Sequence, residues 1–361
     1  TLHQMIQNEQ QNRVLPAEWY PQKGVMLTWA HAETDWRPYL NEIYKTLLSL
    51  AKAIAKYEKV LVVAQQKEEV LQMLNDELGA QLMQNVVVVE CKTNDTWARD
   101  HGFITLLEKQ NDGSIQPVYM DFQFNGWGKK FESLYDNAIN QYLCDNNIIK
   151  GKWQDCNHFV LEGGSIESDG EGTIFTTSTC LLAPNRNQPL TKQEIEEQLI
   201  HFFNAKRVVW LDHGELIGDD TDGHIDTIVR IAPNNTIVYV GCEDTNDEQY
   251  NDFKALKEQL IALKTLDNKP YRLLELPMPK AIYDDENQRL PATYANFLII
   301  NNAVILPTYN QPENDKKAAK VLQEAFPDRE IISIDAQIVI EQHGSLHCLT
   351  MQIPQEAEGI L

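Results

Sequence analysis

The sequence predicts an α/β protein built as one continuous domain over residues 1–361, and three observations favour this interpretation. Runs rich in β-branched and aromatic residues alternate with amphipathic helical segments along the whole chain. No Pro/Gly/Ser-rich linker or low-complexity tract divides it. A hydrophobic fraction of 43% and a charged fraction of 23% are typical of a packed protein and exclude a disordered or collagen-like chain.

Nine segments are predicted to be strands because they concentrate Val, Ile, Tyr, Phe and Thr. They are residues 60–64, 86–90, 117–124, 173–177, 207–211, 236–240, 296–300, 303–307 and 330–334. The sequences NDGS (111–114) and SDGEG (168–172) have the composition of tight turns between strands.

Helices are predicted between these strands. Within residues 36–57, apolar side chains recur at three- and four-residue steps and form one buried stripe: Leu40, Ile43, Leu47, Ala51 and Ile54. Thr191 followed by Glu194 is a capping box that begins a helix reaching about Phe203. Further helices are expected at 247–264, 313–325, 67–78 and 132–143. The strand-strand-helix-strand rhythm indicates an internal repeat of about five units.

Composition restricts the function classes. Lys and Arg number 31 against 53 Asp and Glu, which gives a net charge of −22. Such a charge repels nucleic acid and anionic lipid and favours a cationic partner, so we expect no nucleic-acid and no membrane role. Six scattered cysteines without a CxxC pair do not suggest a disulfide scaffold. Residues 1–13 lack a signal-peptide pattern, and no long apolar run is present, so the expected compartment is the cytoplasm.

Two segments place polar residues beside apolar stretches: the first follows the predicted strand 86–90, where α/β proteins bind ligands, and the second follows the apolar HFVL (158–161). NDTWARDHG (94–102) contains Trp97, Arg99, Asp100 and His101, although an ordinary Arg–Asp surface pair would explain part of it. LEGGSIES (161–168) contains Glu162 before two glycines, which allow a sharp turn or a close approach to a ligand. No Lys or GxGxxG pattern supports a phosphate loop there.

A third segment, LIGDDTDGHIDTIVRI (216–231), contains Asp219, Asp220 and Asp222 before His224 and Asp226. In an extended chain, residues two apart point to the same face, so His224 and Asp226 can share a site. The pair could bind a metal with Glu162 or His101 as a third ligand, act in acid/base chemistry, or be structural, and no HExxH spacing favours the metal.

The fourth segment, EQHGSLHCLTMQIP (341–354), contains Cys348 beside His347 after a glycine-bearing loop. A cysteine there is a candidate nucleophile or a buried apolar side chain; packing suffices for Cys180 and Cys242. Together, one Cys, one His and several carboxylates suit a guanidinium substrate, whose planar cation matches carboxylates in bidentate fashion. A thiolate can attack its carbon, and a histidine can protonate the departing ammonia.

The order TWARDHG, LEGG, DGHID, YANF (294–297) and HCLT (347–350) resembles the agmatine deiminase family, which belongs with the Porphyromonas-type peptidylarginine deiminases to the guanidine-modifying pentein superfamily. The resemblance extends from RVLPAEWYPQKGVMLTW (13–29) to MQIP (351–354). It implies a five-bladed α/β propeller with pseudo-fivefold symmetry, the pentein fold, in a single catalytic domain. It departs at EQHGSL, where relatives often have more glycines, and at HGF after Asp100, where they commonly have Gly-Pro.

The resemblance also implies roles for the motif residues. Cys348 corresponds to the nucleophile, His224 to the general acid/base and Glu162 to its orienting partner. Asp100 and Asp226 correspond to the carboxylates that hold the guanidinium. Asn296 matches a position near the site without an assigned role, Trp97 a position in the channel wall, and Asp220 or Asp222 a position facing the distal amine.

The implied activity is that of a hydrolase of linear amidines, which converts agmatine and water to N-carbamoylputrescine and ammonia in putrescine and polyamine metabolism. A covalent cysteine intermediate is expected, with no cofactor and no metal. The expected partner is a small cationic guanidine, and the oligomeric state, a homo-oligomer included, stays open.

Three alternatives remain at this point. Another guanidine, arginine or peptidyl-arginine, could be the substrate, in which case Arg99 is the candidate partner for the α-carboxylate. A metal-dependent hydrolase using His224, Asp226 and Glu162 is the second alternative. A non-catalytic polyamine-binding protein is the third.

Overall fold

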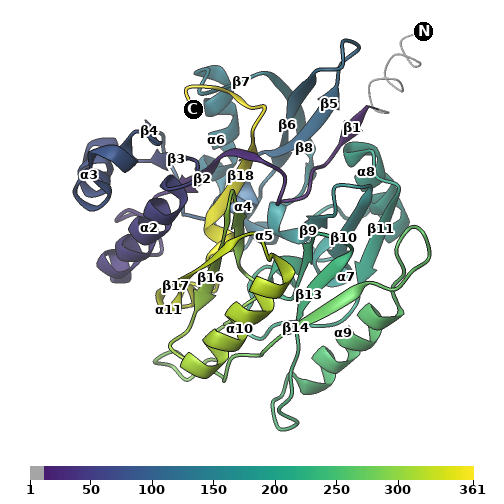
Figure 1. Ribbon diagram of the computed structural model, residues 1–361. Coiled ribbons are helices and arrows are strands. Elements are labelled where there is room, and N and C mark those ends of the chain that lie inside the picture. The colour runs from purple at the N-terminus through teal and green to yellow at the C-terminus, as the bar shows by residue number, and fades with distance from the viewer. Residues whose placement is uncertain (1–11) are drawn as a thin grey trace.

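Five small sheets of three or four strands form the framework of residues 12–361, the part of the chain that the computed structural model describes (Figure 1). In each sheet an inner strand pairs antiparallel with a middle strand, which pairs in parallel with a third strand. The inner, middle and third strands are β5 (Ile104–Lys109), β6 (Ile115–Gln123) and β8 (Lys152–Val160); β9 (Ile166–Ser168), β10 (Thr173–Thr177) and β11 (Arg207–Leu211); β12 (Val229–Ala232), β13 (Thr236–Val240) and β14 (Arg272–Leu276); β15 (Leu298–Ile300), β16 (Ala303–Thr308) and β17 (Glu330–Asp335); and β18 (Thr350–Pro354), β2 (Gln22–Thr28) and β3 (Lys59–Ala64).

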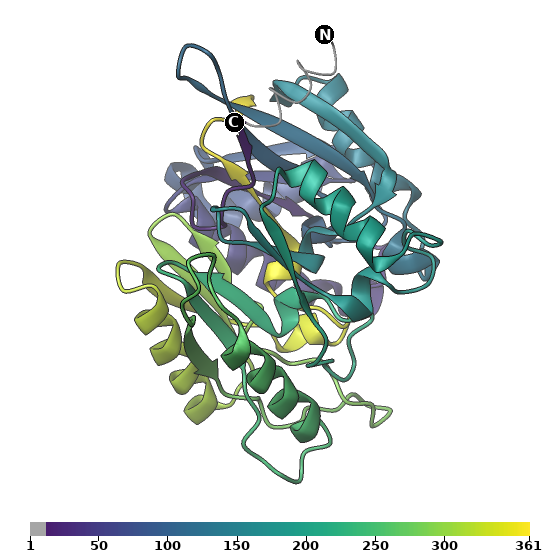
Figure 2. The same cartoon turned by 90° about the vertical axis from the view of Figure 1, so that its right-hand side faces the viewer.

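A helix connects the two parallel strands of every sheet, because a parallel pair needs a crossover connection. These helices are α6 (Leu134–Asp145), α8 (Lys192–Phe203), α9 (Tyr250–Ala262), α10 (Pro312–Ala325) and α2 (Leu40–Ala55). Figure 1 shows α2, α8, α9 and α10 at the periphery, and the turned view in Figure 2 has the yellow C-terminal segment enclosed by the sheets. The fivefold repeat expected from the sequence is therefore present as five blades.

The C-terminal strand completes the first blade. β18 pairs with β2 in antiparallel register, with Thr350 opposite Leu27 and Met351 opposite Met26. The same sheet continues beyond β3 through α3 (Lys67–Met83) to β4 (Val86–Glu90). Shorter pieces extend the edges: β1 (Arg13–Val14) on β5, and β7 (Ile149–Lys150) on β19 (Glu358–Gly359). The blade that contains β18, the strand after Cys348, is thus built from both ends of the sequence.

All nine predicted strands and all six predicted helices are confirmed, with shifted ends. Ile43, Leu47, Ala51 and Ile54 form the buried stripe of α2, whereas Leu40 at the helix start is only half-buried. The capping box is present, with the Thr191 hydroxyl accepting from the Glu194 N–H and the Glu194 carboxylate accepting from the Thr191 N–H. β15 begins at Leu298, so Asn296 lies in the turn before it. The prediction that the N-terminus has no signal-peptide pattern depends mostly on residues 1–11, which lie outside the described residues.

The two predicted turns connect inner and middle strands. Residues 111–114 join β5 to β6, and Gly113 adopts a φ of 87°, which favours glycine. Residues 168–172 join β9 to β10. Within residues 12–361, no helix has the length and apolar character needed to cross a bilayer.

Candidate active site

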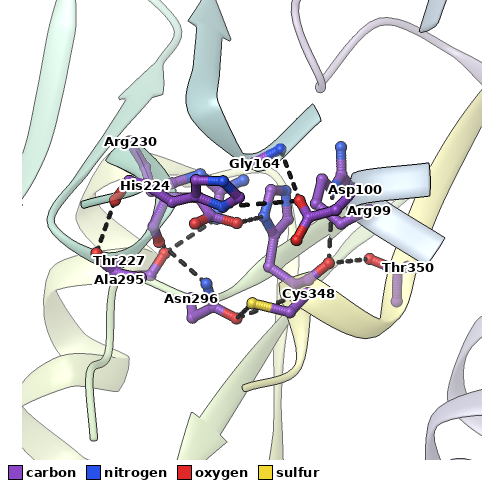
Figure 3. A network of polar contacts seen from close by, with 12 residues as sticks. Arg99, Asp100, Gly164, His224, Thr227, Arg230, Ala295, Asn296, Cys348 and Thr350 are labelled. Atoms are coloured by element: carbon purple, nitrogen blue, oxygen red, sulfur yellow. Dashed lines mark hydrogen bonds and ion pairs between the residues drawn. The ribbon is translucent and has the colours of Figure 1, made fainter. Parts of the chain in front are cut away.

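A short turn precedes every inner strand, and these five turns bring the motif residues together. Four of them are single helical turns: α4 (Ala98–His101), η2 (Gly163–Ser165), η3 (Ile225–Thr227) and η4 (His347–Leu349). The fifth, residues 293–297, leads into β15. Figure 3 shows Asp100, His224, Asn296 and Cys348 from four of these turns gathered in one network. The blade repeat thus explains how residues 250 positions apart can act together.

His224 lies between two carboxylates and is 1% exposed. Its Nε2 lies 3.0 Å from the Glu162 carboxylate, and its Nδ1 lies 3.7 Å from Asp100 Oδ1. Burial lowers the pKa of the imidazole, but Asp100, Cys180 and the Glu162 hydrogen bond outweigh burial and raise it well above its usual value. His224 is therefore positioned to hold a proton near neutral pH.

Glu162 is held by Arg186, a residue that no sequence motif indicated. The Arg186 guanidinium donates to both carboxylate oxygens at 2.8–3.2 Å, and both side chains are almost fully buried. Burial raises the pKa of Glu162, but His224 and Arg186 overcome this effect and lower it. Glu162 therefore stays ionised and fixes the imidazole ring, as a second carboxylate commonly does for a functional histidine.

Asp100 and Asp226 are buried carboxylates near the same ring. Asp100 accepts from the indole N–H of Trp127 at 2.9 Å and the backbone N–H of Gly164 at 3.1 Å. Asp226 Oδ2 accepts from His347 at 2.8 Å, but its Oδ1 has no hydrogen-bond partner, and neither does His224 Nδ1. Buried polar atoms without partners are rare, so the unpaired Asp226 Oδ1 indicates a place for a ligand with N–H donors.

The pKa values of the two aspartates differ in direction. Burial and the negative charges of Asp226 and Glu162 raise the pKa of Asp100 to about 6, against the pull of His224. For Asp226, burial is opposed by the hydrogen bond and charge of His347, and the pKa is lowered. Both groups are ionised above about pH 6, ready for a cation.

Gly164 leaves room among these groups. A Cβ there would lie 2.7 Å from His224 Nδ1, 2.8 Å from Asp100 Oδ1 and 3.0 Å from Asp226 Oδ2. The first two contacts are shorter than real Cβ atoms tolerate, and the third is tighter than most. The second glycine of LEGG is thus required by the close approach of the carboxylates and the imidazole.

Cys348 lies at the same place and is 7% exposed. Its backbone N–H and its Sγ both approach Asn296 Oδ1, at 3.2 and 3.4 Å, while Asn296 donates to the Asp226 carbonyl at 3.1 Å. Burial and the charges of Asp226 and Asp100 raise the pKa of the thiol well above its usual range. In the empty site the sulfur is therefore a thiol.

A cavity of about 990 Å³ opens onto Cys348 and Asp100. Trp97 and Asp220 line it, together with Trp127 and further acidic groups: Glu33, Asp35, Asp95, Glu132 and Asp136. Its cations among the described residues are Lys129, Lys130 and, when protonated, His343.

Asp222 is engaged elsewhere. Its carboxylate pairs with Lys130 at 2.7 Å and with Arg186 at 2.8 Å, and it is absent from the described lining of the cavity. Of the two aspartates considered for the distal amine, the geometry therefore leaves Asp220 better placed.

The segment carrying Trp127 has a strained backbone. Gly126, Trp127, Gly128 and Lys129 have φ values of 72, 57, 84 and 66°. Left-handed conformations are costly for Trp and Lys and persist where the surroundings impose them. Here they place the indole N–H on Asp100, and sequence patterns gave no sign of this.

Arg99 and His101 face away from the cavity. Arg99 lies 3.7 Å from Glu18 and contacts the His347 carbonyl and Met351 Sδ, lining a separate small cavity of about 60 Å³. His101 contacts Thr28 at 3.0 Å, and burial lowers its pKa to about 3. Neither side chain is therefore placed to bind a substrate carboxylate in the cavity or to act as a metal ligand together with His224.

Among the described residues, Glu162, Cys180 and His224 offer ligand atoms within 4.8 Å of one another. Cys180 is fully buried, as expected for a packing residue, yet it also adjoins the imidazole. Asp226, which the metal alternative required, is not in this group, and the Arg186 cation already occupies the Glu162 carboxylate. Positive charge at that position disfavours a second cation.

Residues 14–354 match the family of Porphyromonas-type peptidyl-arginine deiminases. The chain belongs to this family. It is 36% identical over 365 residues to a protein of Mycoplasma capricolum whose provisional name is agmatine deiminase, covering 94% of this chain and 95% of that one.

Solved structures agree with the fold. A provisionally named arginine deiminase from Porphyromonas gingivalis has a TM-score of 0.89 at 46% identity, covering 96% of this chain and 99% of that one. An agmatine deiminase of C. jejuni with substrate bound has a TM-score of 0.86 at 39% identity, covering 97% of both chains. The expected pentein fold is thereby confirmed, as is membership among guanidine-modifying deiminases.

Proposed function

We propose that this deiminase acts on agmatine and hydrolyses it to N-carbamoylputrescine and ammonia through a covalent intermediate on Cys348. The observation that carries the proposal is the pairing of two buried carboxylates, Asp100 and Asp226, beside the cysteine, with Asp226 Oδ1 lacking a partner. A guanidinium between them would supply the missing donors and neutralise their charge.

The cavity favours a substrate that is cationic at both ends. Asp220 and Asp35 line it, and acidic groups outnumber its two lysines, Lys129 and Lys130, in the described lining. Lys130 is already paired with Asp222 at 2.7 Å. Free arginine has an α-carboxylate that would need a cationic partner, and Arg99 faces the opposite side of the ring. Agmatine has an ammonium in that position, which Asp220 can face across the cavity.

The thiol becomes reactive when the substrate binds. In the empty site the two aspartates raise the pKa of Cys348. A guanidinium offsets their charge, so the thiol loses its proton to solvent and the thiolate adds to the guanidinium carbon. Asp100 and Asp226 hold the nitrogens during this addition.

His224 then transfers protons in both halves of the reaction. Its imidazolium protonates the departing nitrogen, which leaves as ammonia and produces an S-alkylthiouronium on Cys348. The neutral imidazole next takes a proton from water, and the resulting hydroxide adds to the same carbon. Collapse of this second tetrahedral adduct breaks the C–S bond and restores the thiolate. The added hydroxyl loses its proton, and the ureido product is released.

Ureido product formation from agmatine, arginine and an arginyl peptide, with and without a chelator, tests the proposal. We expect turnover of agmatine alone, unaffected by chelation. Preferred turnover of arginine or the peptide would reassign the substrate, and loss on chelation would restore the metal-dependent alternative.

The proposed nucleophile is tested by Cys348→Ser, with Cys144→Ser on the outer helix α6 as the matched control. We expect the first variant to bind agmatine without turnover and the second to behave as wild type. Agmatine binding by the wild type without turnover of any guanidine would instead indicate a binding protein.

A further inference from the structure

A buried ionic network lies behind the catalytic turns, and His347 connects it to the site. The His347 side chain is 2% exposed. Its Nδ1 lies 2.8 Å from Asp226 Oδ2, and its Nε2 lies 2.6 Å from Glu18 Oε1. Both contacts are within hydrogen-bond distance, and both partners are carboxylates.

The protonation of His347 follows from its partners. An ionised carboxylate only accepts hydrogen bonds, and a neutral imidazole has a single N–H. Against burial, Arg230 and His347 lower the pKa of Glu18, and His347 lowers that of Asp226, so both partners are ionised. Independently of His347, Arg230 donates to both oxygens of Glu18, and the charges of His224 and Arg230 favour the ionised form of Asp226 against burial. Two accepting partners require two N–H donors, which only the imidazolium provides.

The surroundings balance this charge. Arg230 donates to Glu18 through Nη2 at 2.9 Å and to Glu167 through Nε at 2.7 Å, and Arg99 lies 3.7 Å from Glu18. Three anions (Glu18, Glu167 and Asp226) thus face three cations (Arg99, Arg230 and His347). With a neutral His347 the buried set would carry an uncompensated negative charge, which is costly.

We propose that His347 is a positioning residue that holds Asp226 ionised and aims its free Oδ1 at the guanidinium. This inference rests on the proposed function, in which Asp226 binds the substrate. His347 touches no reacting atom; it acts through Asp226, whose other titratable or charged neighbours are His224, Asp100, Cys348, Arg230 and Arg99.

Removal of the imidazolium changes the acid side of the pH profile. Without the hydrogen bond and charge of His347, burial and the neighbouring charge of Asp100 would raise the pKa of Asp226. Two such neighbouring groups couple, and the second ionises at a higher pH by about one unit or more. We therefore expect His347→Gln to move the acid limb of the kcat/KM profile to higher pH by about one unit and to make it steeper. At pH 6, kcat/KM of the variant should then be lower by a further factor of roughly ten.

Three variants make the test specific. Gln places its amide near the position of Nε2 and keeps the contact to Glu18, whereas Asn places its amide near Nδ1 and keeps a donor for Asp226. We expect His347→Asn to shift the limb in the same direction by less. His213→Gln is the control, because His213 is half-exposed and pairs only loosely with Asp252 at 3.8 Å.

A second measurement reports the charge without activity. In ¹⁵N-histidine NMR spectra at pH 8, we expect a doubly protonated imidazole signal that disappears in His347→Gln and remains in His213→Gln. A singly protonated signal for His347 would overturn the inference. An unshifted acid limb in folded His347→Gln enzyme would also overturn the inference. A histidine with only a structural role would lower stability or kcat when replaced and would leave the acid limb at the same pH. If the wild type turned over no guanidine at all, the proposed function would fail first, and this role with it.

Discussion

Gly164→Ala tests whether the empty space between the carboxylates and the imidazole is the reaction site. The substitution adds one methyl group at a position with ordinary φ, so no backbone strain confounds it. The new Cβ would lie 2.7 Å from His224 Nδ1, 2.8 Å from Asp100 Oδ1 and 3.0 Å from Asp226 Oδ2. Relief to an ordinary contact requires shifts of roughly 0.4 to 0.7 Å in up to three groups.

These groups cannot withdraw freely, because each is hydrogen-bonded on its far side. His224 is held by Glu162 at 3.0 Å, Asp226 by His347 at 2.8 Å and Asp100 by Trp127 at 2.9 Å. Overpacking of this kind destabilises a protein by about 1–3 kcal/mol, and a displacement approaching 1 Å can cost about 10²-fold in rate. We expect kcat/KM for agmatine to fall by about 10²-fold.

The assay is steady-state formation of ureido product, with thermal unfolding measured in parallel. Gly241→Ala is the matched control, since its Cβ would meet only the flexible, partly exposed side chain of Glu275, at 2.3 Å. We expect this control to retain activity. Wild-type kcat/KM in Gly164→Ala, or an equal loss in the control, would refute the assignment of this space to the substrate.

Three further outcomes follow from the same geometry. Because the pKa of Asp100 is raised to about 6, kcat/KM should fall as the pH drops through 6 and the carboxylate is protonated, and a profile flat down to pH 5 would contradict this. Arg186→Met leaves Glu162 buried without its cation, so the free energy of unfolding, measured by denaturant titration, should fall by about 3–5 kcal/mol. Activity should fall as well, and unchanged stability would contradict the importance of this ion pair. Gly344→Ala would bring a Cβ within 2.3 Å of the buried Trp97 ring, so KM for agmatine should rise and the unfolding temperature should fall; an unchanged KM would contradict the role of Trp97 in the channel wall.

Much of the fold could be predicted because its signals are local. The strand at 173–177 and the capping box at Thr191 depend on neighbours within a few residues. The blade repeat was visible as a rhythm of element types even without sequence identity between units. The predicted beginning of the strand at 296 is wrong because Phe297 adds to the apolar run of β15 while it lies, like Asn296, in the preceding turn.

The motif residues could be predicted because their types and order are chemically distinctive, whereas their supports could not. Arg186 lies 24 residues after Glu162 in a stretch of Asn, Gln and Pro that has no periodic pattern. Trp127 reaches Asp100 only through four consecutive left-handed residues. Contacts of this kind depend on tertiary structure, which overrides local preference.

Ring closure accounts for the most distant of these contacts. Glu18 and His347 are 329 positions apart, yet β18 pairs with β2, and this pairing brings the two ends of the chain to one sheet. The same pairing places Cys348, at the start of the last inner strand, beside turns from the other blades.

If the fivefold arrangement serves to deliver one group from each turn, loosening β18 should disable the site before it unfolds the peripheral helices. Amide hydrogen exchange of an Ile353→Ala variant should therefore show faster exchange in β18 and β2 and reduced kcat/KM, with α9 and α10 still protected. Equal loss of protection in all blades would instead indicate that the ring opens as a whole.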